Sequence, residues 1–272
     1  DVDGAVNFAA DVTFADGADI ITASAGTSNF RAGVNAGNSI ASGGNYNVAV
    51  GDEAGTALTT GTHNTFLGST SGDAITDADY NTALGSRALT TNVLGSANTA
   101  VGFDALFTVN PATAVTMYNT AVGYQAGGAV TTGIQNTLIG GLAGDAITTA
   151  NNNTAVGKSS LSATTTGGEN TAVGTNALKV NTTASNNTAV GTNALTANTT
   201  GAQNTAVGTS AGAAITTAVN TVVMGYQAGD AITTGNNNVA IGTTALSANT
   251  TGASNTALGH AALLANTTAA NN

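Results

Sequence analysis

Hydrophobic and polar residues alternate in short segments that recur every seventeen residues along most of the chain. Each segment reads Asn-Thr-Ala-Val-Gly or a close variant, as at residues 153–157, 170–174, 187–191 and 204–208. The repeat glycines that set the period are Gly51, Gly68, Gly85, Gly102, Gly123, Gly140, Gly157, Gly174, Gly191, Gly208, Gly225, Gly242 and Gly259. Only the interval from Gly102 to Gly123 departs from the period, because it holds twenty-one residues. A fixed period of this size predicts a repeat architecture in which each unit stacks on its neighbours.

Positions within a unit are counted here from its repeat glycine, negative before it and positive after it. Position −1 is apolar in every unit, and position −4 is Asn in twelve of thirteen, the exception being Thr221. The alternation predicts a short strand, with the −1 side chain inside and the alanine common at −2 outside. Stacked copies of the Asn are expected to form an amide ladder, and the glycine to take a positive φ at a bend. The clearest copies of this structural repeat are Asn153, Asn170, Asn187 and Asn204 with Gly157, Gly174, Gly191 and Gly208.

Positions +4 and +7 vary together. Position +4 is Leu in one group of units, and position +7 is then polar, as in Leu195 with Asn198. Position +4 is Gly in a second group, and position +7 is then apolar, as in Gly212 with Ile215. Close-packed interiors accept exchanges that conserve total volume. The pattern therefore predicts that both positions fill one core.

These observations predict an all-β protein, a parallel β-solenoid or β-roll of 17-residue coils. We expect two short strands and two tight bends per coil, with coils about 4.8 Å apart. Residues 47–272 form the repeat shaft, and residues 1–46 an N-terminal β fibrous segment followed by a connector. The apolar content of each coil is small, and an outward column of alanines allows close approach of another chain. A homotrimeric fibre is therefore the expected assembly.

Composition narrows the classes of function. The formal charge is −10, with only four basic residues, so nucleic acid is not an expected partner. No apolar run is long enough for a membrane span, so membrane insertion is not expected either. There is no cysteine, hence no disulfide framework. The chain begins at Asp1 without a signal peptide, from which we expect a fragment or a processed product.

No catalytic or cofactor-binding constellation stands out. Asp73, Asp77 and Asp79 could gather around a hard cation, but they read more simply as a solvated acidic edge. His63 and His260 lie in different units without a third ligand. No nucleophile motif accompanies the serines, so we expect no enzyme activity, no cofactor and no metal.

Two features are candidates for surface contact. Phe103, Tyr124 and Tyr226 share position +1, where aromatic rings either stack on host surface glycans or pack within the fibre. Phe107 and Tyr118 belong to the unit with four extra residues, which is either a contact loop or a bulge that covers its own apolar residues.

Paired threonines recur at positions +8 and +9, for example Thr199 and Thr200. A regular rank of threonines on a flat solenoid face is one way to bind ice. The alternative is that β-branched residues simply favour strand ends. The Asn-Thr-Thr strings also match the sequence pattern for N-glycosylation, although the period explains them without sugars.

The Asn-Thr-Ala-Val-Gly strings, with Ala-Leu and Asn-Thr-Thr-Gly between them, resemble repeats of bacteriophage tail fibres of the marine type. They are also similar to the head repeats of YadA-like trimeric autotransporter adhesins, whose motif is Asn-Ser-Val-Ala-Ile-Gly. The resemblance covers residues 43–272 and implies homotrimeric parallel β-rolls. It implies the shaft of a virion tail fibre that joins a baseplate or tail and presents a host-binding surface. The alternatives are the head of a bacterial cell-surface adhesin and, third, an ice-binding solenoid.

Overall fold

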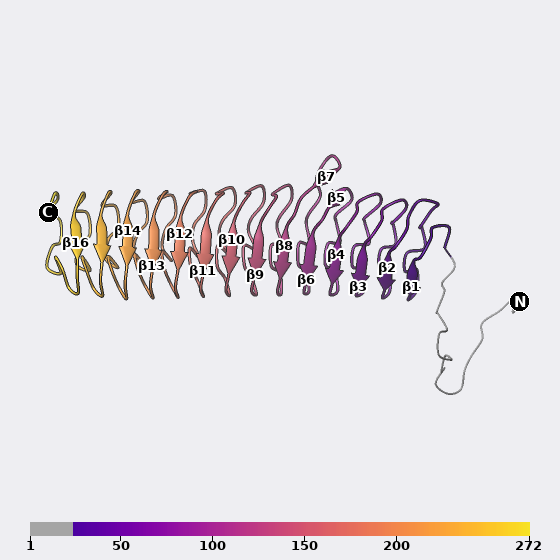
Figure 1. Cartoon of the computed structure of the whole chain (residues 1–272), viewed down its shortest axis with the longest axis horizontal. Coiled ribbons are helices and arrows are strands. Elements are labelled where there is room, and N and C mark those ends of the chain that lie inside the picture. Colours follow the sequence, from indigo (N-terminus) through magenta and orange to yellow (C-terminus); the bar gives the residue numbers. More distant parts are fainter. Residues whose placement is uncertain (1–23) are drawn as a thin grey trace, which may run out of the picture.

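The computed structural model describes residues 24–272, which form a rod of stacked coils without helices (Figure 1). Each coil contributes one strand of three residues just before its repeat glycine. The strands of the main sheet are β1 (Phe30–Ala32), β2 (Val48–Val50), β3 (Thr65–Leu67), β4 (Thr82–Leu84), β6 (Thr99–Val101), β8 (Thr120–Val122), β9 (Thr137–Ile139), β10 (Thr154–Val156), β11 (Thr171–Val173), β12 (Thr188–Val190), β13 (Thr205–Val207), β14 (Val222–Met224), β15 (Val239–Ile241) and β16 (Thr256–Leu258).

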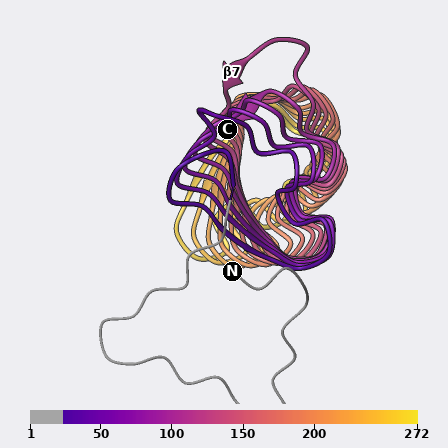
Figure 2. The same cartoon turned by 90° about the vertical axis from the view of Figure 1, so that its right-hand side faces the viewer.

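These fourteen strands form one parallel sheet in chain order, which confirms the predicted all-β parallel solenoid. Adjacent strands pair residue for residue at the period, so that Ala155 lies opposite Ala172 and Val156 opposite Val173. Seen along the rod, successive coils superimpose as a closed loop (Figure 2). Thirteen strand spacings of about 4.8 Å give the sheet a length of about 62 Å.

The prediction of two strands per coil is wrong. Within residues 24–272, the side of each coil opposite the main sheet consists of turns and bends, apart from one extra pair of strands. These turns depend on left-handed backbone conformations that recur in every coil. The repeat glycine itself has φ near +130°, and a Cβ on Gly157 would lie 2.6 Å from the carbonyl carbon of Gly174. Only glycine fits this bend, as the sequence predicts.

The predicted facing of the strand is also wrong. The −2 residue points into the coil: Ala155, Ala172 and Ala189 are completely buried. The −1 residue points outward, and Val173 retains 37% of its accessible surface. The column of alanines is therefore part of the core and cannot be a contact surface between chains. The outer face of the sheet instead carries position −3, mostly Thr, and position −1, an aliphatic residue.

The predicted sharing of the core by positions +4 and +7 agrees with the structure. Leu195 and Ile215 are both fully buried, and a Cβ placed on Gly212 would lie 2.8 Å from Ile215 Cδ1. Position +4 has a positive φ in both types of coil, 49° at Leu195 and 59° at Gly212. The leucines therefore accept a conformation that costs an L-residue about 1–2 kcal/mol.

A third position draws on the same volume. From β2 onward, three −2 residues are larger than alanine, namely Phe66, Leu138 and Val223. Each of them lies between two coils that have glycine at +4. A Cβ on Gly55 would lie 2.7 Å from the Phe66 ring, and one on Gly72 would lie 2.5 Å from it. The −2 side chain of the sheet thus fills the volume that the missing +4 side chain leaves.

The solenoid begins earlier than predicted. Phe30 of β1 pairs with Val48 of β2, and Gly33 has the φ of a repeat glycine although it precedes Gly51 by eighteen residues. Residues from about 29 therefore form a first coil within the segment predicted as a connector. The N-terminal β fibrous segment predicted ahead of the connector lies outside the described residues.

The twenty-one-residue coil carries a protruding loop. Strands β5 (Gly95–Ser96) and β7 (Val115–Thr116) pair in parallel and form a separate two-stranded sheet at its base. The loop stands out from the side of the rod near β7 (Figures 1 and 2). Residues 112–116 are exposed, whereas Pro111 and Met117 are buried. The loop is consequently a solvent-facing projection whose two ends are anchored in the core.

Candidate interaction surfaces

The predicted Asn ladder runs inside the rod. Asn170 donates from its backbone N and from Nδ2 to Asn153 Oδ1, at 3.0 and 3.1 Å, and its Nδ2 also donates to the Ala184 carbonyl. Asn153, Asn170, Asn187 and Asn204 are all buried. Satisfied amides of this kind fix the register of successive coils. The ladder, with Gly157, Gly174, Gly191 and Gly208, is therefore structural and presents nothing to a partner.

The outer face of the main sheet is the largest regular surface of the rod. From β2 to β16 its −3 and −1 positions carry no charged residue. Exposed aliphatic side chains recur along it, including Leu67, Leu84, Ile139, Val173 and Met224. The −3 threonine hydroxyls, for example that of Thr171, make no hydrogen bond within the described part of the chain. We call these two columns the Thr-x-Val face. The sequence pattern did not predict this face, because the −1 residues were expected to lie inside the coil.

The paired threonines form a different edge of the coil. The +8 hydroxyl donates to a backbone carbonyl of the next coil, as from Thr199 to Thr216 at 3.1 Å. The +9 residue, such as Thr200, is exposed. The hydroxyl groups at +8 are thus engaged in holding coils together. The asparagines of three Asn-Thr-Thr strings, Asn181, Asn198 and Asn249, are fully buried and cannot accept a glycan in the folded rod.

The aromatic candidates near the insertion form one stack. The rings of Phe103 and Tyr124 are 5.8 Å apart and inclined by only 9°. The Arg87 guanidinium lies 5.4 Å from the Phe103 ring centre and 4.5 Å from that of Phe107, and its Nε is 3.1 Å from Asp104 Oδ1. Both faces of the Phe103 ring are therefore occupied. This arrangement is the one expected for packing within the rod, and it leaves no free face on which a sugar could stack.

The remaining aromatics lie apart from this stack. Tyr118, at the base of the insertion, and Tyr226, about six coils further along, are each more than half exposed. Tyr46, His63 and Tyr80 form a second stack, with ring centres 4.9 and 5.2 Å apart. His63 thus has a packing role between two tyrosines. The structure does not bring the five predicted contact residues, Phe103, Phe107, Tyr118, Tyr124 and Tyr226, into a single site.

The acidic residues are dispersed. Asp77 accepts hydrogen bonds from Thr59 and Thr60, which lower its pKa, and Asp79 accepts one from the Thr62 amide. Burial raises the pKa of three aspartates that occupy position +5 after a glycine at +4: Asp73, Asp145 and Asp230. No group of three His, Cys, Asp or Glu residues within residues 24–272 could hold a metal ion.

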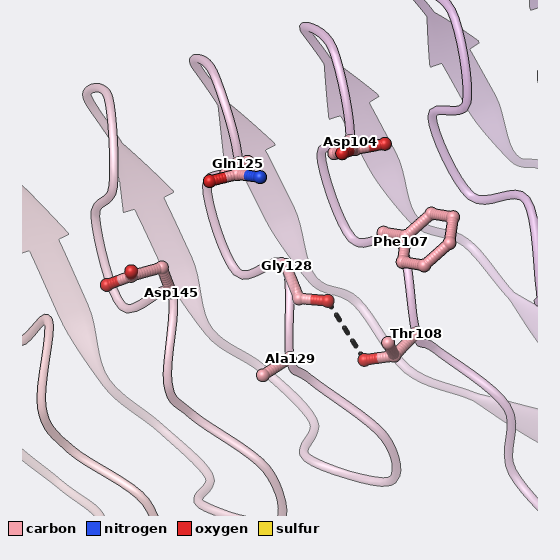
Figure 3. Close-up of a pocket in the computed structure, with 7 residues that line it drawn as sticks. All are labelled: Asp104, Phe107, Thr108, Gln125, Gly128, Ala129 and Asp145. Atoms are coloured by element: carbon pink, nitrogen blue, oxygen red, sulfur yellow. Dashed lines mark hydrogen bonds between the residues drawn. The ribbon is translucent and has the colours of Figure 1, made fainter.

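A shallow hollow of about 230 Å³ lies where Gly128 has no side chain (Figure 3). Thr108 donates its hydroxyl to the Gly128 carbonyl at 2.9 Å. The Phe107 ring and the Asp145 carboxylate turn away from Gly128 in opposite directions (Figure 3). The side chains around the hollow therefore do not converge on a ligand.

No family model, curated protein or solved structure matches the chain. The described residues contain no helix that could cross a membrane. What the structure defines is the class, a β-solenoid repeat protein whose coils have seventeen residues.

Proposed function

We propose that this chain is the shaft of a fibre, with no enzymatic activity, and that it assembles as a homotrimer through the Thr-x-Val face. The observation that carries the proposal is an uncharged sheet face with regularly exposed aliphatic residues along the whole rod. Exposed apolar patches of this extent mark contact surfaces. Solenoids of this shape place one end at a fixed distance from the other, which is what a shaft requires.

The size of the face fits a protein interface. Its length is about 62 Å, and three strand residues span about 10 Å, so each copy offers about 600 Å². Two copies in contact bury about 1,200 Å², the lower end of stable interfaces. A trimer with this face toward its axis adds further contacts for every chain. The interface uses aliphatic side chains at −1 and replaces the alanine column that the sequence suggested.

The resemblance to marine phage tail-fibre repeats supports a virion tail fibre, attached to a baseplate or tail, as the setting. Host surface glycans are the expected targets of such a fibre. The head of a bacterial cell-surface adhesin, assembled in the same way, is the alternative. The two differ in the genes that surround the coding sequence: capsid and baseplate genes for the fibre, and a membrane-anchor segment for the adhesin.

Charges placed on the Thr-x-Val face test the assembly. A Val156→Lys, Val173→Lys, Val190→Lys variant should lower the solution mass to that of one chain, since three lysines per copy would meet across the interface. The matched control, Thr149→Lys, Thr166→Lys, Thr183→Lys, introduces the same charges at exposed +9 positions and should keep the assembled mass. Equal masses for the two variants would contradict the proposed interface.

Ice binding is a second candidate, supported by one observation. Within residues 24–272 the −3 threonine hydroxyls make no hydrogen bond, and they repeat at the strand spacing on a sheet face without charges. Such an array could order water in a lattice, but only if the face is not covered by another chain. A monomeric mass together with thermal hysteresis, abolished by Thr154→Lys, Thr171→Lys and Thr188→Lys, would favour this function over the fibre.

A further inference from the structure

One aromatic ring of the rod has an open face. Tyr124 stacks one face on Phe103, whose other face is covered by Arg87. The residue that follows Tyr124 in the same column, one coil along the rod, is Gly141. A Cβ placed on Gly141 would meet no atom within 4 Å. The second face of Tyr124 therefore looks into space that in other coils holds a side chain.

The backbone fixes this arrangement. The Leu142 amide donates to the Tyr124 carbonyl at 2.9 Å, and the Ser159 amide to the Gly141 carbonyl at 3.0 Å. Tyr124, Gly141 and Lys158 are thus successive +1 residues in three hydrogen-bonded coils. Tyr124 and Lys158 are two strand spacings apart, about 9.6 Å. A gap of one coil, open to solvent, separates an aromatic ring from a lysine.

The same position elsewhere shows that this gap is unusual. Tyr226 occupies position +1 as well, but the coils on either side carry Thr209 and Thr243 there. Tyr124 is 55% exposed, and its open face is parallel to the Phe103 ring to within 9°. A six-membered ring stacked on Tyr124 would occupy the level of the missing side chain at Gly141.

We propose that the space above Gly141 binds an acidic pyranose, with the apolar C–H face of the sugar on the Tyr124 ring and its carboxylate near Lys158. Aromatic faces are electron-rich and attract polarised C–H groups, while the sugar hydroxyls stay in water. Lys158 is exposed and supplies a positive charge on a rod with a formal charge of −10. The site goes beyond the proposed shaft, because it requires neither the assembly nor a virion.

The test uses the full chain with methyl glucuronoside as the probe and saturation-transfer NMR as the measurement. We expect transfer to the ring C–H protons of the probe. Gly141→Thr should reduce it at least fivefold, because the new side chain fills the gap. The repeat accepts this residue, since Thr175, Thr192 and Thr209 occupy the same position. Gly128→Thr is the matched control in the neighbouring coil; its Cβ would meet no atom closer than 3.4 Å, and transfer should persist.

Lys158→Gln separates the two parts of the proposal. It should weaken binding of methyl glucuronoside several-fold and leave the weaker binding of methyl glucoside unchanged. Absence of transfer in the unmodified protein, or equal transfer in the Gly141→Thr and Gly128→Thr variants, would overturn the site. So would stronger transfer to benzoate than to either sugar, because it would indicate general aromatic stacking. None of these results depends on the solution mass, so failure of the site and failure of the proposed fibre remain distinguishable.

Discussion

Exchanging the two kinds of core within one coil is the sharpest test of how the rod is packed. Leu195 at +4 and Asn198 at +7 are both fully buried. Leu195→Gly removes a buried leucine, which costs about 2–5 kcal/mol in comparable cores. It also releases a leucine from φ 49°, which returns about 1–2 kcal/mol. The expected net loss of unfolding free energy is about 0–4 kcal/mol.

Asn198→Ile alone should also destabilise, for two reasons. Its side chain would compete with Leu195 for one volume, at about 1–3 kcal/mol. It would also remove the Nδ2 donor that now lies 3.0 Å from Asn181 Oδ1, which leaves that oxygen buried without its partner. In the double variant the isoleucine occupies the space that Leu195 has left, as Ile215 does beside Gly212. We therefore expect the double variant to be about 2 kcal/mol more stable than the sum of the single changes indicates.

Urea denaturation followed by circular dichroism, at one protein concentration, gives the four free energies of this cycle. The loss of the Asn181 contact is present in both variants that contain isoleucine, so it cancels. Additivity within about 0.5 kcal/mol would refute the shared core.

Three further predictions concern single features of the coil. Gly157→Ala should lower the unfolding free energy measured by urea denaturation by about 3 kcal/mol or more, because Gly157 has φ +132° and its Cβ would lie 2.6 Å from Gly174. Gly141→Ala should change that free energy by no more than about 0.5 kcal/mol. Similar losses in the two variants would contradict the tight bend. Thr221→Asn should add about 1 kcal/mol to the unfolding free energy and slow hydrogen exchange of the Asn238 amide, which has no acceptor within the described residues. Unchanged exchange of this amide would contradict the ladder. Burial raises the folded-state pKa of three aspartates, so their ionisation destabilises the rod above about pH 3.8 and this penalty disappears as the pH falls through the folded pKa. Replacing Asp73, Asp145 and Asp230 by Asn should raise the melting temperature at pH 7 more than at pH 4. An equal rise at both pH values would contradict the raised pKa of these aspartates.

The sequence predicted the features that depend on spacing alone. The period fixed which residues stack, so the Asn ladder, the glycine bend and the exchange between +4 and +7 could all be inferred. A ladder residue such as Asn170 needs only its copies above and below it. Each of these features is a contact between equivalent positions, and a repeat determines such contacts directly.

The facing of the strand could not be read from the alternation, which shows that −2 and −1 point in opposite directions but not which is inside. Size suggested valine inside. The interior beside the sheet is already filled by Leu195 and its equivalents, so only alanine fits at −2. The larger −2 residues indicate that position −2 faces the interior, because Phe66 and Leu138 occur only where glycine at +4 leaves room.

The functional surfaces were harder to predict because they depend on absent side chains. Phe103 and Tyr124 looked equivalent in the sequence, since both occupy position +1. In the rod, Arg87 covers the second face of the Phe103 ring, whereas Gly141 leaves the second face of the Tyr124 ring open. The first coil was missed because Phe30–Ala32 lacks the usual Thr-Ala-Val residues and its glycine is displaced by one.

The mass of the unmodified protein in solution tests the central claim, that the Thr-x-Val face joins copies into a fibre. Sedimentation equilibrium at micromolar concentration should give three times the 26.0 kDa of one chain, independent of salt because the face carries no charge. A mass of 26.0 kDa under the same conditions would contradict the assembly and leave the face open to solvent.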